Sequence, residues 1–315
     1  MLGALLVFCA FSWPVSAQKQ TSDPNKFALI INGAGGEAAY AKQFEEWTRQ
    51  LNSVLSDRFG FDTKHVTTLK NATADQVKAT FGTLKADLEP NNVLFVFLIG
   101  HGTFDGKESK FNLVGPDIPA TEYNALLSAL PTRRIVVFNM SSASGEFIKS
   151  LTAKGRIVVT ATRSGQETNA TRFAGFLIAA LTATDADTDQ DGHTSVLEAF
   201  IYANRLTADF YKNAGRLATE HALLDDNGDG VGHEKLEAGE GLLARATYLD
   251  SLSVDEAAAS AATGRLLTER ARLEGEIEQL IGRKASMQES EYEAALERLF
   301  IELAKINRTI KQAGS

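Results

Sequence analysis

The sequence predicts an α/β fold in which a mostly parallel sheet is flanked by helices. Three short segments, 27–31, 93–99 and 135–138, are apolar at every position, and segments with helical periodicity lie between them. Strands that are apolar on both faces must be covered on both faces, and parallel strands need long crossover connections, which are usually helices. The alternation therefore predicts a sandwich with the sheet at its centre.

The elements expected of this sandwich run from residue 26 to about residue 165. Strands are expected where consecutive residues are apolar, and helices where apolar residues recur three and four positions apart. In the capping box Thr73-x-x-Gln76, each side chain bonds to the other residue's backbone N–H, which predicts a helix start. The expected elements are a strand at 27–31, a helix at 40–54, a strand at 66–69, the helix that begins at Thr73, a strand at 93–99, a short helix at 122–130 and strands at 135–138 and 157–160.

The composition is that of a globular protein and argues against nucleic-acid binding. Of the 315 residues, 44% are hydrophobic and 23% are charged, and the formal net charge is -8. Such an acidic chain offers no basic surface for a phosphate backbone. Beyond the N-terminal segment, no apolar stretch reaches the roughly 18 residues of a membrane-spanning helix, so no membrane span is expected.

The first 17 residues have the features of a secretory signal peptide. An apolar run at 2–11 is followed by Pro14 and by the small residues Ser16 and Ala17. This pattern predicts cleavage after Ala17 and export, either to a periplasm or as a secreted protein. The alternative, a buried N-terminal strand, agrees less well with the polar linker at 18–25 that follows.

The single cysteine, Cys9, lies in this N-terminal segment. The mature chain would then have no disulfide, no cysteine-ligated zinc and no cysteine nucleophile. Its stability outside the cell would come from packing and from hard metal ions bound by oxygen ligands.

The rest of the chain is expected to have three parts. The α/β domain is placed at 26–170, a helical region with two acidic loops at 171–249, and an Ala-, Glu-, Leu- and Arg-rich segment at 250–315. In the last part, apolar residues such as Leu299 and Leu303 alternate three and four positions apart, which predicts a C-terminal helical hairpin. Two interpretations stay open: the hairpin packs back on the domain, or it is a coiled coil that gives self-association or holds a partner.

The most specific motif is the twelve-residue segment from Asp187 to Glu198, which matches the EF-hand calcium loop. Such a loop has side-chain oxygens at positions one, three and five, glycine at six, a backbone carbonyl at seven and a bidentate glutamate at twelve. Carboxylates this close together repel one another unless a cation neutralises them. We expect Ca²⁺ to bind here through Asp187, Asp189, Asp191, the carbonyl of His193, Ser195 and Glu198.

A second acidic loop begins at Asp225 and carries Asn227 and Asp229 at positions three and five. Leu236 stands where the bidentate glutamate would be, although a glutamate lies on either side of it. Three interpretations stay open: a calcium site of shifted geometry, a degenerate EF-hand that pairs with the first loop, or an acidic turn.

A histidine and a serine follow two strands of the predicted sheet. His101 and Gly102 come after the apolar run 93–99, and Ser142 lies in the small-residue loop that follows 135–138. Open α/β sheets place their ligand sites at the carboxyl ends of the strands. The sequence therefore predicts that His101 and Ser142 form a pair at this edge.

These two segments resemble those of the legumain-type cysteine peptidases, which share the fold of caspases and gingipains. In residue-by-residue order, His101 corresponds to the catalytic histidine, Met140 to an acidic residue, Ser142 to the nucleophilic cysteine, and Ser144 and Gly145 to the family's Ser-Gly. The resemblance covers about residues 26–204 and implies a caspase-like sandwich.

The resemblance also implies roles for residues outside the pair. Arg163 lies where the family builds its specificity pocket, and Asn32 matches an asparagine in the family's first loop. Backbone N–H groups near Gly102 and Ser142 would form the oxyanion hole.

A serine at the nucleophile position changes the expected activity. A hydroxyl is far less acidic than a thiol and needs a base that a carboxylate orients, and Asp105 is the nearest carboxylate to His101 in the sequence. We therefore expect a calcium-binding pseudopeptidase that binds a peptide or protein. Two alternatives stay open: an active endopeptidase or acyl hydrolase that uses Ser142 and His101, and an interaction protein that acts through its hairpin. In the plainest alternative, His101 is a turn histidine bonded to backbone.

Overall fold

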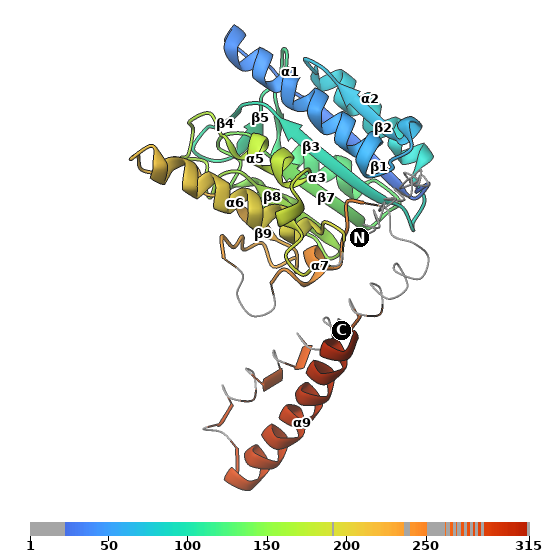
Figure 1. The fold of residues 1–315 in the computed structure, drawn as a ribbon, viewed down its shortest axis with the longest axis vertical. Coiled ribbons are helices and arrows are strands. Elements are labelled where there is room, and N and C mark those ends of the chain that lie inside the picture. Colours follow the sequence, from blue (N-terminus) through green and yellow to red (C-terminus); the bar gives the residue numbers. More distant parts are fainter. Residues whose placement is uncertain are drawn as a thin grey trace, which may run out of the picture.

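The computed structural model describes residues 23–190, 192–235, 240–250, 262, 265–266, 269, 272–273, 276–277, 280, 283–284 and 287–313. The predicted signal peptide, the calcium-loop residue Asp191 and Leu236 of the second acidic loop lie outside the described residues. The described part of the chain contains an α/β sandwich built on one large sheet (Figure 1).

The large sheet has six strands in the order β2-β1-β3-β7-β8-β9. Their bounds are β1 Lys26–Asn32, β2 Val66–Leu69, β3 Val93–Ile99, β7 Arg134–Asn139, β8 Arg156–Thr160 and β9 Leu223–Asp225. All neighbouring pairs are parallel except β8 and β9, which are antiparallel. The mostly parallel sheet expected from the apolar runs is thus confirmed.

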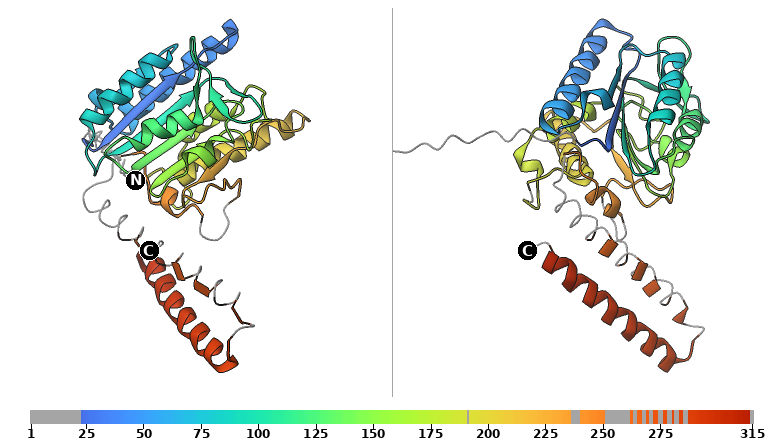
Figure 2. Two further views of the ribbon diagram at one scale, coloured as in Figure 1. Left: turned by 180° about the vertical axis from the view of Figure 1, so that it is seen from behind. Right: turned by 90° about the vertical axis from the view of Figure 1, so that its right-hand side faces the viewer.

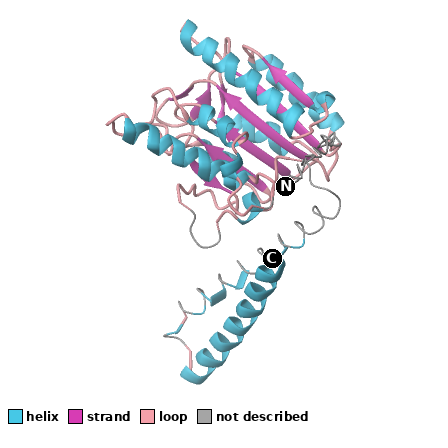
Figure 3. Ribbon diagram, viewed as in Figure 1, coloured by secondary structure: helices cyan, strands magenta, loops and turns pink. Residues whose placement is uncertain are grey.

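Helices cover both faces of this sheet (Figures 2 and 3). One face carries α1 (Ala38–Ser53), α5 (Phe173–Ala180), α6 (Val196–Asn213) and the short α7 (Leu242–Arg245), and the other carries α2 (Ala74–Asp87), α3 (Ala120–Ser128) and α4 (Phe147–Leu151). The central strand β3 supplies Phe95 and Phe97 to the first core and Leu94 and Val96 to the second. A strand that is apolar at every position is required because successive side chains point to opposite faces.

The ends of several helices follow from local sequence. The capping box of Thr73 and Gln76 is present and begins α2, as expected. The first helix continues into a π-helical turn at Val54–Arg58, and short 3₁₀ turns occur at Thr63–His65 and Thr184–Ala186.

A small antiparallel sheet follows β3 and was not expected from the sequence. It consists of β4 (Gly102–Phe104), β5 (Ser109–Phe111) and β6 (Ile118–Pro119), in that order. Each strand has only two or three residues, so neither apolar alternation nor a strand-length run marks it in the sequence. Because β4 starts at Gly102, this sheet adjoins the predicted pair.

The described residues of the region 171–249, which the sequence sets apart as a helical region, pack in the same sandwich. Helices α5 and α6 pack on the sheet in one core with α1, and β9 adds an edge strand. Composition alone could not indicate this, because the shared core depends on contacts that are distant in sequence.

The C-terminal part contains α9 (Glu289–Ala313) and a separate apolar cluster. This cluster joins Leu273, Ile277 and Leu280 to Tyr292 and Leu299. No helix among the described residues is both long and apolar enough to cross a membrane.

Candidate functional site

The loops that follow β3 and β7 touch at the carboxyl edge of the sheet. The hydroxyl of Ser142 accepts a hydrogen bond from the N–H of Gly102 (3.1 Å) and donates a hydrogen bond to the carbonyl of Gly102 (3.1 Å). A Cβ at position 102 would lie 2.3 Å from the carbonyl oxygen of Ser142, so only glycine fits there. The structure therefore brings the two expected segments together through Gly102.

The imidazole of His101 faces α1. Its ring packs edge-on against Tyr40 and Phe44, with centroid distances of 4.9 and 5.0 Å. Burial lowers the pKa of His101, while a hydrogen bond with the backbone of Gly35 acts in the opposite direction. The ring is consequently neutral near pH 7. Within residues 23–190, the hydroxyl of Ser142 bonds to the backbone of Gly102 and not to this ring.

Asp105 is held within its own turn between β4 and β5. Its carboxylate accepts hydrogen bonds from the N–H groups of Lys107 and Glu108 and pairs with Lys110 at 3.1 Å. The bond from Glu108 is the main cause that lowers the pKa of Asp105 to about 2. This carboxylate therefore does not orient the imidazole of His101.

The loop that carries Ser142 is buried and fastened on two sides. Ala143 adopts a left-handed conformation (φ +51°), and its carbonyl accepts a bond from the hydroxyl of Ser109 in β5 (2.6 Å). On the other side, the hydroxyl of Thr162 accepts the N–H of Gly145 at 3.0 Å and lies 3.2 Å from the hydroxyl of Ser144. These contacts hold the loop in one shape, and no motif in the sequence indicates the role of Ser109.

The other two residues implied by the resemblance have structural partners. Arg163 pairs with Glu167 at 3.1 Å, and the same carboxylate contacts the imidazole of His221. Asn32 is buried and donates to the hydroxyl of Thr48, which ties β1 to α1.

Three carboxylates of the expected calcium loop converge. Oxygen atoms of Asp187, Asp189 and Glu198 all lie within 4.8 Å of one another. Gly192, at position six, has φ +87°, and its N–H donates to Asp187 at 2.9 Å. The backbone thus makes the sharp turn for which glycine is needed at this position.

Glu198 has two roles at the start of α6. It forms a capping box with Ser195, and its other oxygen accepts the N–H of Thr188 at 2.8 Å. Burial acts to raise the pKa of Glu198, but the hydrogen bonds from Ser195 and Thr188 outweigh it and lower the pKa. Glu198 is therefore ionised at neutral pH, as a metal ligand must be.

The calcium loop is fastened to the segment at 247–250. The N–H of Val196 donates to the carbonyl of Thr247 (2.8 Å), and the imidazole of His193 lies 2.8 Å from the carboxylate of Asp250. Lys26, at the start of β1, bonds in turn to the carbonyls of Leu249 and Asp250.

The second acidic loop shares one turn bond with the first, because the glycine at position six donates its N–H to the aspartate at position one in both: Gly230 to Asp225 and Gly192 to Asp187. Both oxygens of Asp225 accept backbone N–H groups of the loop, from Gly228 and Gly230.

Asp229 belongs to a group of converging ligand atoms together with His233 and Glu240, and the amide of Asn227 bonds to both carboxylates. Neither His233 nor Glu240 was expected as a ligand, because Glu240 lies beyond the twelve-residue loop and an imidazole at position nine is not part of the calcium-loop pattern.

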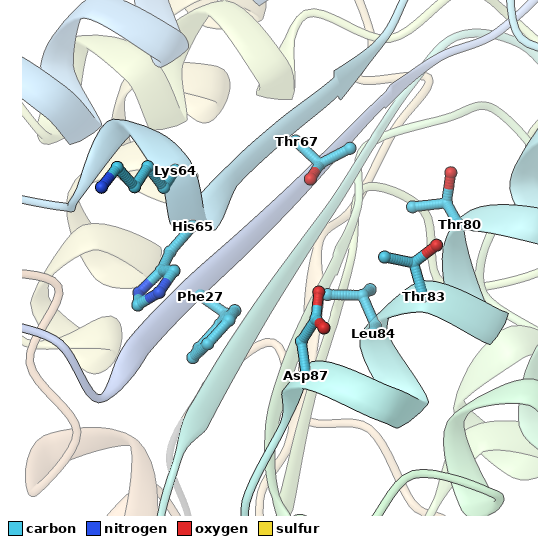
Figure 4. Close-up of a pocket in the computed structure, with 8 residues that line it drawn as sticks. All are labelled: Phe27, Lys64, His65, Thr67, Thr80, Thr83, Leu84 and Asp87. Carbon is cyan, nitrogen blue, oxygen red and sulfur yellow. The ribbon is translucent and has the colours of Figure 1, made fainter.

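A cavity of about 470 Å³ lies beside β2 and α2, near the amino ends of β1 and β2 (Figure 4). Phe27 and His65 stack in it with a centroid distance of 4.0 Å, and the hydroxyls of Thr67 and Thr80 line it. None of the residues expected from the sequence to form a site lines this cavity.

Comparison with known proteins gives no family. No family model matches the chain, and no curated protein matches it. The crystal structure of protein GSU0716 from Geobacter sulfurreducens is similar, with 16% identity and a TM-score of 0.41, over 58% of this chain and 89% of that chain.

Proposed function

We propose that this chain is an exported, calcium-binding pseudopeptidase of the legumain type, which binds a peptide or protein segment without cleaving it. A mostly parallel six-stranded sheet flanked by helices is the arrangement expected of a caspase-like sandwich. The resemblance at His101-Gly102 and Ser142 supports the same assignment, because these segments meet at one edge of the sheet.

The observation that carries the proposal is the engagement of the Ser142 hydroxyl by both backbone groups of Gly102. A serine nucleophile needs a base bonded to it and an unoccupied oxyanion hole. Here the N–H of Gly102, which the resemblance assigns to the oxyanion hole, already donates to the hydroxyl. Asp105 is engaged elsewhere, so no carboxylate next to His101 in the sequence orients the ring.

Calcium binding is proposed at the loop from Asp187 to Glu198. It is supported by the converging carboxylates and by the left-handed Gly192. Calcium takes oxygen ligands of this kind, and a site with a dissociation constant of roughly 10⁻⁴ to 10⁻³ M is occupied at extracellular calcium levels.

The helical hairpin is proposed as a surface for self-association. The cluster of Leu273, Ile277 and Leu280 with Tyr292 and Leu299 supports the pairing of two helices within one chain, which is the hairpin expected from the sequence. The mass in solution of the full chain and of a chain ending at residue 250 tests this: only the full chain is expected to exceed the monomer mass.

Labelling with a fluorophosphonate, which modifies activated serines, tests the central proposal. We expect no labelling of the wild-type protein and no hydrolysis of Asn- or Asp-containing peptides. Labelling or turnover that disappears in Ser142→Ala would instead support the active hydrolase with His101 as its base.

A further inference from the structure

After β9, the expected loop residue Asp229 converges with two potential metal ligands that were not expected from the sequence, His233 and Glu240. Ligand atoms of Asp229, His233 and Glu240 all lie within 4.8 Å of one another. The imidazole distinguishes this group from the carboxylate cluster of the first loop. Asp225, which the EF-hand pattern places at position one, is not a member of this group, and its two oxygens accept backbone N–H groups of the loop.

The fold holds these ligands in place. The backbone of His233 exchanges two hydrogen bonds with Leu224 in β9, at 2.8 and 3.0 Å. Its Nε2 atom lies 3.4 Å from Oε1 of Glu240, and the two side chains are only 16% and 5% exposed. The amide of Asn227 donates to both Asp229 and Glu240 and so sets the distance between the two carboxylates.

We propose that Asp229, His233 and Glu240 form a second metal site, which takes a divalent transition-metal ion such as Zn²⁺ rather than Ca²⁺. Calcium is bound by oxygen ligands, whereas an imidazole nitrogen together with carboxylates is a typical ligand set for zinc. A cation also relieves the repulsion between two carboxylates, one of them buried. Three protein ligands leave a fourth position for water. The inference is independent of the proposed pseudopeptidase function.

Calorimetric titration of the full mature chain with ZnCl₂ and with CaCl₂, after removal of metal by a chelator, tests the site. We expect tight binding of one zinc ion that is weakened about tenfold or more by His233→Gln and by Glu240→Gln. Zinc affinity should be unchanged in Asp187→Asn, which removes a ligand of the first loop, and in Glu234→Gln, a matched control at an exposed neighbouring glutamate.

Cobalt gives a second measurement with the same variants. The visible absorption bands of bound Co²⁺ should appear in the wild-type protein and in Glu234→Gln and be lost in His233→Gln. Far-UV circular dichroism of metal-free His233→Gln establishes that this variant folds. Zinc affinity no greater than calcium affinity, or zinc binding that survives in both His233→Gln and Glu240→Gln, would overturn the proposal.

Discussion

Ser142 is a buried residue whose hydroxyl satisfies both backbone groups of Gly102. In a serine hydrolase the nucleophile is required for turnover, whereas here the same atom has a structural role. The two roles predict different consequences of removing the hydroxyl.

Ser142→Ala is expected to lower the free energy of unfolding by about 1–3 kcal/mol, because it leaves a buried N–H and a buried carbonyl without a partner. Urea denaturation measures this change, with Ser53→Ala at an exposed position as the control. Unchanged stability combined with loss of a wild-type hydrolytic activity would contradict the structural role.

Glu198 allows a similarly sharp test of the calcium loop. Glutamine can replace glutamate in a capping box, so Glu198→Gln should retain the start of α6 and lose the charge needed for calcium. At 1 mM calcium the wild-type protein should gain about 1 kcal/mol in stability, and the variant little of this.

Thermal unfolding with calcium and with chelator measures this gain. The exposed Glu45→Gln serves as the charge-matched control and should respond to calcium as the wild type does. If calcium stabilises Glu198→Gln as much as the wild type, Glu198 is not a calcium ligand.

Among the elements, α2 is one whose start is defined by local sequence, through the capping box of Thr73 and Gln76. Thr73→Ala removes the capping hydroxyl and should cost about 1 kcal/mol, while Thr73→Ser should cost less because it keeps the oxygen. Chemical denaturation of the two variants measures both losses in the free energy of unfolding. Their difference is the contribution of the capping hydroxyl, because Thr73→Ser loses only the methyl group. Equal losses in both would show that the cap contributes nothing.

The large sheet could be predicted because its central strands are apolar along their whole length. The strand at 93–99 was predicted at its observed bounds, and β1 and β7 to within one residue at each end. Strands β4 to β6 and β9 could not be, since they have two or three residues each and depend on neighbours distant in sequence.

The candidate site, like the fold, could be predicted in part. The meeting of the His101 and Ser142 segments follows from the rule that parallel strands end at one edge. The bonding of the hydroxyl to Gly102 does not follow from it, because a backbone contact leaves no residue pattern. Glu240 was missed because it lies 13 residues beyond Asn227, outside the loop spacing.

At the scale of the whole molecule, Lys26 joins the first strand of the sandwich to the segment 240–250, where the sandwich ends. Burial lowers the pKa of Lys26 to about 8, against the opposing effects of Asp23 and Asp250. Between pH 8 and 10.5 the unfolded chain therefore binds more protons at this lysine than the folded chain does. Its contribution to the free energy of unfolding rises with pH across this interval.

Lys26→Met should remove that rise. From pH 8 to 10.5, the free energy of unfolding of the wild type should rise by on the order of 2–3 kcal/mol relative to that of Lys26→Met. Urea denaturation at several pH values measures it, with the exposed Lys85→Met as control. A difference that is constant with pH would mean that this amine titrates alike in both states.

The contact between Lys26 and the carbonyls of Leu249 and Asp250 has a topological consequence: the two ends of the segment 23–250 lie side by side. Chains whose termini are adjacent tolerate circular permutation. A short linker from residue 250 to residue 23, with new termini opened at the exposed turn between Gly215 and Arg216, should therefore give a chain that folds to the same sandwich.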